Sequence, residues 1–143
     1  MSQPSPSARR FARRAILQAL YQWQLSGASA AEIELYFFVH QKMDKVDKVY
    51  FSELLKAIIA RHDELDSLLQ PVLDRKVAEL TPVERGILYL GCHELKERLD
   101  IPYKVVINES VQLAKDFGAQ DSFKYVNGVL DRLSLSLRQA ERQ

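Results

Sequence analysis

The chain has 143 residues, of which 47% are hydrophobic and 27% charged, and its formal net charge is +1. A chain of this size and composition can bury a core as one globular domain without disulfides or metals. Its one cysteine, Cys92, excludes an internal disulfide. Without an apolar run of about 18 residues or an apolar amino-terminal signal, we expect a cytoplasmic protein with no membrane contact.

Positive charge is concentrated near the amino terminus. Residues 1–31 contain Arg9, Arg10, Arg13 and Arg14 and no acidic residue, so this segment carries +4 and the rest of the chain −3. A local basic segment on a near-neutral chain favours contact with an anion at one place. Residues 1–7, rich in proline and serine, are predicted to form a disordered lead-in.

Apolar residues recur with helical spacing along the remainder of the chain. Helices are predicted over residues 8–25, 30–40, 46–61, 63–74 with Pro71 as a kink, 82–99 and 103–117, and a seventh helix is predicted to follow a cap at Asp121 or Ser122. The sequence shows no strand alternation, internal repeat or glycine-rich phosphate loop. The predicted fold class is therefore all-α, with about seven helices.

Thr81, Pro82 and Glu84 form the clearest helix start in the chain. Threonine suits the N-cap, proline the first helical position, and a glutamate three residues after the cap can complete a capping box. Apolar residues cover more than half the circumference of the helix that follows. This breadth predicts a central helix that packs on several sides.

Asn127 and Gly128 interrupt the pattern of the last predicted helix. A glycine inside a helix costs about 1 kcal/mol relative to alanine, so helix stability does not explain this pair. Two structural explanations remain open. Gly128 could permit a close helix contact, and Asn127 could bond to the loop after the sixth helix.

The first predicted helix carries Arg10, Arg14, Leu17 and Tyr21 on one face, opposite a face of alanines and Trp23. In one interpretation, the two apolar residues cover another part of the core. In the other, they form a protein-binding stripe beside an arginine patch. Arginine suits RNA because its planar guanidinium binds phosphate bidentately and stacks on bases.

Tyr125 lies off the apolar stripe of the last predicted helix, between Lys124 and Arg132. An aromatic ring with cationic neighbours can stack an unpaired base, a contact that contributes roughly 1–3 kcal/mol. The alternative is a flanking tyrosine with its hydroxyl in water.

Catalytic chemistry finds no support in the sequence. His40, His62 and His93 are scattered and are predicted to lie at the surface, and Cys92 is predicted to be a small core residue. No cluster has the spacing of metal ligands or of an acid/base pair. We expect no enzyme, no metal and no cofactor.

Several motifs together resemble one protein family. In chain order, they are the Arg9–Arg14 opening with Ala19-Leu20-Tyr21 and Trp23; Val83-Glu84-Arg85 with Ile87-Leu88; His93-Glu94-Leu95; Ile101-Pro102; Ile107-Asn108-Glu109; Leu113-Ala114-Lys115; Phe117-Gly118; and Phe123-Lys124-Tyr125-Val126-Asn127-Gly128-Val129-Leu130-Asp131. The chain is similar to the NusB family of transcription antitermination factors from about residue 8 to residue 133.

The resemblance implies a single all-α RNA-binding domain over residues 8–143. It would contain two packed helical subdomains, about residues 8–75 and 80–140. The resemblance further implies a factor that pairs with ribosomal protein S10 and binds boxA-type single-stranded RNA of nascent transcripts, notably of ribosomal RNA operons. Other Nus factors and RNA polymerase would be indirect partners, and termination would be suppressed.

The same resemblance assigns roles to individual residues. The predicted RNA-binding residues are Arg9, Arg10, Arg13, Arg14, Asp121, Lys124 and Tyr125, where Tyr125 takes the place of a base-stacking aromatic that is usually phenylalanine. The predicted S10-binding residues are Leu17, Tyr21 and Glu84. Two alternatives stay open: the NusB-like RNA-binding domain of an rRNA cytosine methyltransferase, and a purely protein-binding helical adaptor.

Overall fold

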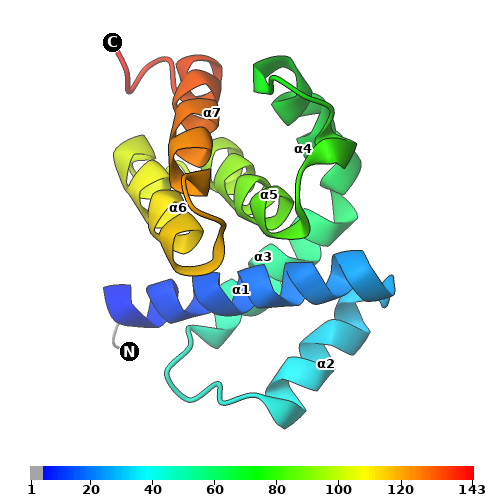
Figure 1. Ribbon diagram of the computed structural model, residues 1–143. Coiled ribbons are helices and arrows are strands. Elements are labelled where there is room, and N and C mark those ends of the chain that lie inside the picture. Colours follow the sequence, from blue (N-terminus) through cyan, green and yellow to red (C-terminus); the bar gives the residue numbers. More distant parts are fainter. Residues whose placement is uncertain (1–4) are drawn as a thin grey trace. The chain divides into compact units, whose positions relative to one another are not determined.

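The computed structural model describes residues 5–143, and every regular element in this range is a helix (Figure 1). The all-α prediction is confirmed. Contacts between Cα atoms divide the chain into two compact units, with the boundary between Ala60 and Arg61. Residues 1–4 of the predicted lead-in lie outside the described residues, whereas Pro6 and Ser7 already belong to the first helix.

The first unit contains three helices, α1 (Pro6–Ser26), α2 (Ala30–His40) and α3 (Lys48–Ala60). α1 begins two residues earlier than predicted, because the Ser5 hydroxyl accepts a hydrogen bond from the Ala8 N–H and Pro6 occupies the first turn. Gly27, with φ +69°, ends the helix in the left-handed conformation that glycine adopts without strain. α1 packs against both α2 and α3.

The second unit contains four α-helices and two 3-10 turns: α4 (His62–Leu69), η1 (Gln70–Val72), η2 (Val77–Glu79), α5 (Pro82–Glu97), α6 (Tyr103–Phe117) and α7 (Ser122–Leu137). The helix predicted over residues 63–74 stops at Leu69. Pro71 lacks an N–H, and its ring clashes with the carbonyl group four residues earlier. It therefore ends the helix instead of kinking it, and the chain continues as η1.

α5 is the central helix of the second unit and contacts α4, α6 and α7 (Figure 1). All ten residues from Gly86 to Leu95 are buried. At its start, the Thr81 hydroxyl accepts from the Glu84 N–H at 3.1 Å, and Glu84 Oε1 accepts from the Thr81 N–H at 3.2 Å. The predicted capping box and the predicted central position are both confirmed.

Two neighbouring residues of α5 gave predictions with opposite outcomes. Cys92 is buried as predicted, and its burial raises the pKa of the thiol to about 12. His93 is only 5% exposed, so its predicted surface position is wrong. Burial lowers the pKa of the His93 imidazole, because the charged form loses hydration there. Both side chains therefore belong to the packing around α5.

α7 runs without interruption through Asn127 and Gly128, which therefore lie inside the helix as predicted. The close helix contact that Gly128 could have permitted occurs at Gly91 of α5. A Cβ atom on Gly91 would lie 2.8 Å from Leu130 Cδ1 of α7. A Cβ atom on Gly128 would meet only Arg132 Nη1, at 3.5 Å. Gly91 thus permits the approach of α7 to α5, and packing does not explain Gly128.

An arginine distant in the sequence closes the carboxyl end of α5. Arg138 is 4% exposed and donates to the carbonyl oxygens of Leu95, Ile101, Arg98 and Glu94 at 2.7, 2.8, 2.9 and 3.1 Å. The last carbonyls of a helix have no partner within the helix, and a guanidinium carries five N–H donors. Arg138 therefore satisfies both the end of α5 and the turn after it.

Candidate nucleic-acid interface

The four predicted RNA-binding arginines all lie in the first half of α1, but they differ in exposure. Arg10 is exposed, Arg9 and Arg14 are half-buried, and Arg13 is only 4% exposed. Cations at the start of a helix face an unfavourable dipole, so helix stability does not account for this cluster. Arg10 offers the most direct access to an anion in solution.

Tyr50 of α3 contacts two of these arginines. Its ring centre lies 4.4 Å from Arg9 Cζ and 5.8 Å from Arg13 Cζ, which are cation–π distances. The Arg13 guanidinium is thereby packed within the first unit and is not presented to solvent. Arg13 thus links α1 to α3 through the Tyr50 ring, and its contact with RNA stays a prediction. Arg9 shares the same ring but keeps partial exposure.

The predicted protein-binding face of α1 is split by burial. Leu17 is 2% exposed and lies in the core, and its contact with S10 stays a prediction. Tyr21 is 43% exposed and lines a shallow groove of about 400 Å³ between α1 and α2. Glutamines 18, 22 and 41 and the apolar residues Leu25 and Tyr36 line the same groove.

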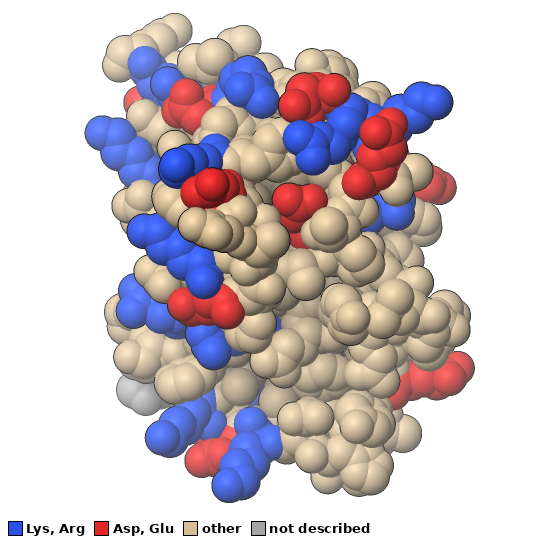
Figure 2. Space-filling model, in the orientation of Figure 1, with Lys and Arg blue, Asp and Glu red and all other residues tan. Residues whose placement is uncertain are grey.

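The surface of α2 extends this apolar area. Leu35 and Val39 are about two-thirds exposed, and Tyr36 and Phe38 are about two-fifths exposed. Figure 2 shows an uncharged area over α2, at the lower right of the view. An exposed apolar area of this kind, with polar amides at its edge, is typical of a protein-binding surface.

Glu84 combines a structural bond with a position at the surface. Besides closing the capping box through Oε1, it accepts a hydrogen bond from the Ser122 hydroxyl through Oε2 at 3.3 Å. Its side chain remains half-buried. A carboxylate can accept about four hydrogen bonds, so Glu84 keeps capacity for a basic partner.

Asp121 and Lys124 lie together at the start of α7. Asp121 takes the N-cap position with φ +69°, but its side chain makes no capping bond. It pairs instead with Lys124, at 3.4 Å between Oδ1 and Nζ, and both side chains are well exposed. The seventh helix begins at Ser122, as predicted.

Tyr125 is held by two residues of the segment between η1 and η2. Its hydroxyl donates to Asp74 Oδ1 at 3.0 Å, and the Arg75 guanidinium lies 4.4 Å from its ring centre. Arg75 also bonds Asp74 through Nε and Nη2, at 2.7 and 3.3 Å. We call these three side chains the Tyr125 cluster. One part of the ring is covered by Arg75, and the hydroxyl is fixed.

The Tyr125 cluster perturbs the titration of its members. The Arg75 guanidinium, and then the Tyr125 hydroxyl, hold the pKa of the Asp74 carboxyl below its usual range. Burial, and then the hydrogen bond to Asp74, raise the pKa of the Tyr125 hydroxyl. At neutral pH the carboxylate is therefore charged and the phenol protonated, which are the states that their hydrogen bond requires.

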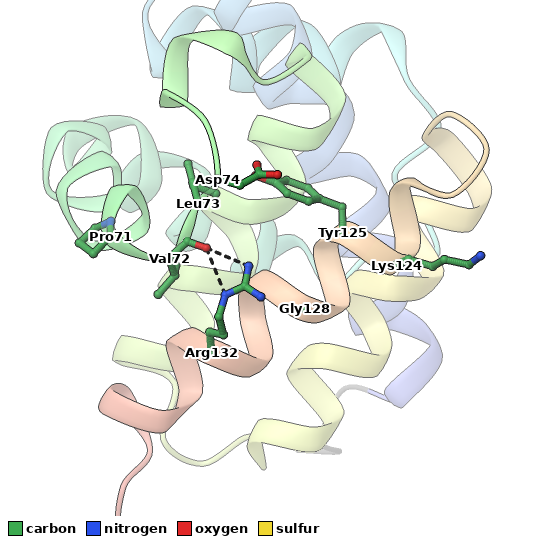
Figure 3. A pocket seen from close by; sticks show the side chains of 8 residues that line it. All are labelled: Pro71, Val72, Leu73, Asp74, Lys124, Tyr125, Gly128 and Arg132. Carbon is green, nitrogen blue, oxygen red and sulfur yellow. Dashed lines mark hydrogen bonds between the residues drawn. The ribbon is translucent and has the colours of Figure 1, made fainter.

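A groove with a volume of about 570 Å³ lies beside the Tyr125 cluster (Figure 3). It is lined by Pro71, Val72, Leu73, Asp74, Lys124, Tyr125, Gly128 and Arg132. Arg132 donates from Nε and Nη2 to the Val72 carbonyl oxygen, at 3.3 and 3.0 Å. This pair of bonds ties α7 to the segment after α4 and fixes the guanidinium at one side of the groove.

Sequence reasoning missed Tyr50, Asp74 and Arg75. Asp74 lies 51 residues from Tyr125 in the sequence, and no local pattern marks such a contact. The nearest sequence signal is the proline at 71, which ends α4 and begins the turn that carries Asp74 and Arg75.

Within residues 5–143, no helix combines the length and hydropathy needed to span a membrane.

Comparisons with known proteins identify relatives along nearly the whole chain. The model of the NusB family matches residues 10–134. The transcription antitermination protein NusB of Alcanivorax borkumensis is 59% identical over 142 residues, which cover 99% of this chain and 95% of the relative.

Solved structures are similar as well. The structure of T. maritima NusB has a TM-score of 0.80 and 28% identity, with 94% of each chain covered. A crystal structure of the antitermination factors NusB and NusE in complex with double-stranded RNA has a TM-score of 0.78 and 27% identity. It covers 92% of this chain and 99% of that chain.

Proposed function

Since the chain belongs to the NusB family, we propose that it is a transcription antitermination factor that acts as an adaptor between RNA and protein. It would pair with ribosomal protein S10 (NusE) and bind boxA-type single-stranded RNA, notably in transcripts of ribosomal RNA operons. Contact with other Nus factors and RNA polymerase would follow indirectly. The observation that carries this proposal is the 59% identity over 99% of the chain to a transcription antitermination protein.

The proposed RNA-binding residues fall into two groups, one in each unit. In the first unit, Arg10, with Arg9 and Arg14, supplies positive charge for phosphates. In the second, Tyr125 supplies a ring for base stacking and Lys124 a cation beside it. Asp121, paired with Lys124 at 3.4 Å, would set the position of that cation. Binding should weaken as salt rises, because phosphate contacts release counterions.

The S10-binding surface rests on Tyr21 and Glu84. Tyr21 is supported by its exposure and by the groove with exposed apolar residues around it. Glu84 is supported by a half-buried carboxylate with remaining hydrogen-bond capacity. An apolar anchor and a charge together favour a specific partner, because the charge selects a basic surface.

This proposal implies that the protein acts without catalysis, in the cytoplasm. The methyltransferase alternative is disfavoured, because the relative that is 59% identical over 142 residues is named as a transcription antitermination protein. We further propose that the two compact units are helical subdomains of one RNA-binding domain, with their boundary near residue 61 instead of residues 75–80.

Fluorescence anisotropy of labelled boxA RNA, measured with and without S10, tests the adaptor function. We expect S10 to strengthen RNA binding by the wild-type protein. Tyr125→Leu should weaken binding about tenfold, since stacking contributes roughly 1–3 kcal/mol per base. Tyr125→Phe, which keeps the ring, is the matched control and should bind within about twofold of wild type.

Two outcomes would contradict the adaptor function. Equal RNA affinity with and without S10 would remove the protein partner from the mechanism. Equal affinity of Tyr125→Leu and Tyr125→Phe would remove Tyr125 from the RNA surface.

Tyr21→Ala tests the S10 surface. In titration calorimetry this variant should bind S10 more weakly than wild type, and its thermal unfolding midpoint should be unchanged.

A further inference from the structure

We propose that Ser122 is a positioning residue through which S10, bound at Glu84, orders the first turn of α7, the part of the helix that carries Lys124 and Tyr125. This inference rests on the proposed function, in which Glu84 faces S10. It adds the route by which the protein partner would strengthen RNA binding. All of these residues belong to the second unit.

The start of α7 lacks a side-chain cap. Asp121 occupies the N-cap position with φ +69°, and its carboxylate pairs with Lys124 and makes no capping bond. Backbone bonds run from the Ser122 N–H to the Ala119 carbonyl at 3.1 Å and from the Lys124 N–H to the Asp121 carbonyl at 3.0 Å. A missing cap costs a helix about 1 kcal/mol. The first turn of α7 therefore relies on contacts with other elements for part of its order.

One such contact joins the first residue of α7 to the third residue of α5. Ser122 is 6% exposed, and its hydroxyl donates to Glu84 Oε2 at 3.3 Å. Oε1 of the same carboxylate accepts from the Thr81 N–H, so Glu84 connects the starts of the two helices. Tyr125 follows Ser122 by nearly one helical turn. The orientation of the Glu84 carboxylate therefore bears on the part of α7 that carries Tyr125.

The hydrogen bond between Ser122 and Glu84 can become stronger. Bonds from a hydroxyl group to an oxygen are usually about 2.5–3.0 Å long, so a bond of 3.3 Å is long. A basic group of S10 that binds Glu84 would hold the carboxylate in one orientation. It need not displace the serine, because a carboxylate accepts about four hydrogen bonds. The fixed carboxylate would then favour the ordered first turn of α7.

Arg75 offers a second route from Glu84 to Tyr125. Its guanidinium lies 4.4 Å from the Tyr125 ring centre. Its hydrogen bond to Asp74, and with a smaller effect the charge of Glu84, raise the pKa of Arg75. A basic group on Glu84 would weaken this attraction. Because this route does not pass through Ser122, the experiment has to separate the two.

Coupling through Ser122 must act in both directions. If S10 binds more tightly to the chain with an ordered first turn, it shifts the chain toward that state. RNA that uses Tyr125 gains affinity from this shift. By linkage, RNA must strengthen S10 binding by the same factor by which S10 strengthens RNA binding. Removal of the Ser122 hydroxyl should reduce both factors equally.

Amide hydrogen exchange of the full chain, with and without S10 and in the absence of RNA, tests the first step. We expect S10 to slow exchange at residues 122–125 about tenfold in wild type, roughly the value of one charged hydrogen bond, and less than about twofold in Ser122→Ala. Ser136→Ala is the matched control, because Ser136 bonds the Leu133 carbonyl of its own helix. This control should behave as wild type, and thermal melts show that each variant is folded.

Anisotropy of labelled boxA RNA, with and without S10, tests the second step. Ser122→Ala should bind RNA alone within about twofold of wild type. The factor by which S10 strengthens RNA binding should be about threefold smaller in this variant than in wild type. Arg75→Gln, measured by exchange and by anisotropy, reports on the alternative route.

The inference is overturned if bound S10 leaves exchange at residues 122–125 unchanged in wild type, or if Ser122→Ala keeps both the protection and the full gain in RNA affinity. It is also overturned if Arg75→Gln removes the protection and Ser122→Ala does not, because the route would then be electrostatic. Failure of the proposed function looks different: S10 would not bind the wild-type chain, or their complex would not bind boxA RNA.

Discussion

Tyr125 illustrates what a single hydroxyl adds at the residue scale. The resemblance to the NusB family places an aromatic there that is usually phenylalanine. In this chain the phenol donates to Asp74, and Asp74 pairs with Arg75, so the ring has a fixed direction. The sequence predicted the aromatic off the apolar stripe and its cationic neighbour Lys124. It could not predict the acid, which comes from a segment 51 residues away.

Arg138 gives the sharpest prediction for a single residue. Replacement by methionine keeps an unbranched side chain but removes the guanidinium hydrogen bonds to four carbonyl oxygens near the end of α5, of which those of Glu94 and Arg98 still accept from backbone N–H groups. We expect unfolding in urea to show a loss of about 3 kcal/mol, as for a broken buried charged network. Gln139→Ala, at an exposed neighbour, should change stability by less than about 0.5 kcal/mol. A loss below about 1 kcal/mol for Arg138→Met would mean that water replaces the guanidinium.

At the scale of elements, local signals predicted most of the structure. The bounds of α2 and α6 agree with the prediction, and the capping box at Thr81 begins α5 as expected. Caps and prolines act within one turn, so a short stretch of sequence contains them. Contacts between elements could not be predicted in this way, because they join residues far apart in the sequence. Neither the approach of α7 to Gly91 nor the burial of Arg13 against Tyr50 has a local signature.

The capping box allows the two roles of Glu84 to be separated. Thr81→Ala should lower stability by about 1 kcal/mol and leave S10 affinity unchanged, because it removes only the cap. Glu84→Gln keeps an oxygen that can accept from the Thr81 N–H, so stability should change by less than about 0.5 kcal/mol. Its lost charge should weaken S10 binding about fivefold, or about 1 kcal/mol.

Chemical denaturation would measure the stability of both variants, and titration calorimetry would measure their affinity for S10. We expect Thr81→Ala to change only the stability and Glu84→Gln to change mainly the affinity. If Glu84→Gln binds S10 as tightly as wild type, the carboxylate serves only the helix start. If Thr81→Ala lowers S10 affinity as much as stability, the two roles of Glu84 are not separable. S10 affinity would then depend on the position of the start of α5.

At the scale of the whole molecule, RNA binding should divide into an electrostatic part and a stacking part. With S10 present, Arg10→Ala should reduce the slope of log K against log salt by about 0.7, the value for one phosphate on a single strand. Tyr125→Leu should lower affinity at every salt concentration and leave the slope unchanged. Anisotropy titrations over a salt series would measure both quantities.

An unchanged slope for Arg10→Ala would remove this arginine from the phosphate contacts. The sequence alone could not rank the four arginines, because all of them lie within six residues and carry the same charge. Their burial separates them: Arg10 is exposed, and Arg13 is 4% exposed. The family resemblance, by contrast, came from motifs spread over the whole chain, and the relatives confirm it.

The arginine at the end of α5 also bears on the order of folding. Arg138 lies 37 to 44 residues from the carbonyl groups that it bonds, so these bonds form only after a long loop closes. The start of α5 can form early in folding, because it is capped by residues that are near in the sequence. The carboxyl end of α5 is completed only when Arg138 reaches it. The nucleus of the second unit should therefore include the Thr81 end of α5, and the Arg138 contacts should add mainly to the barrier against unfolding.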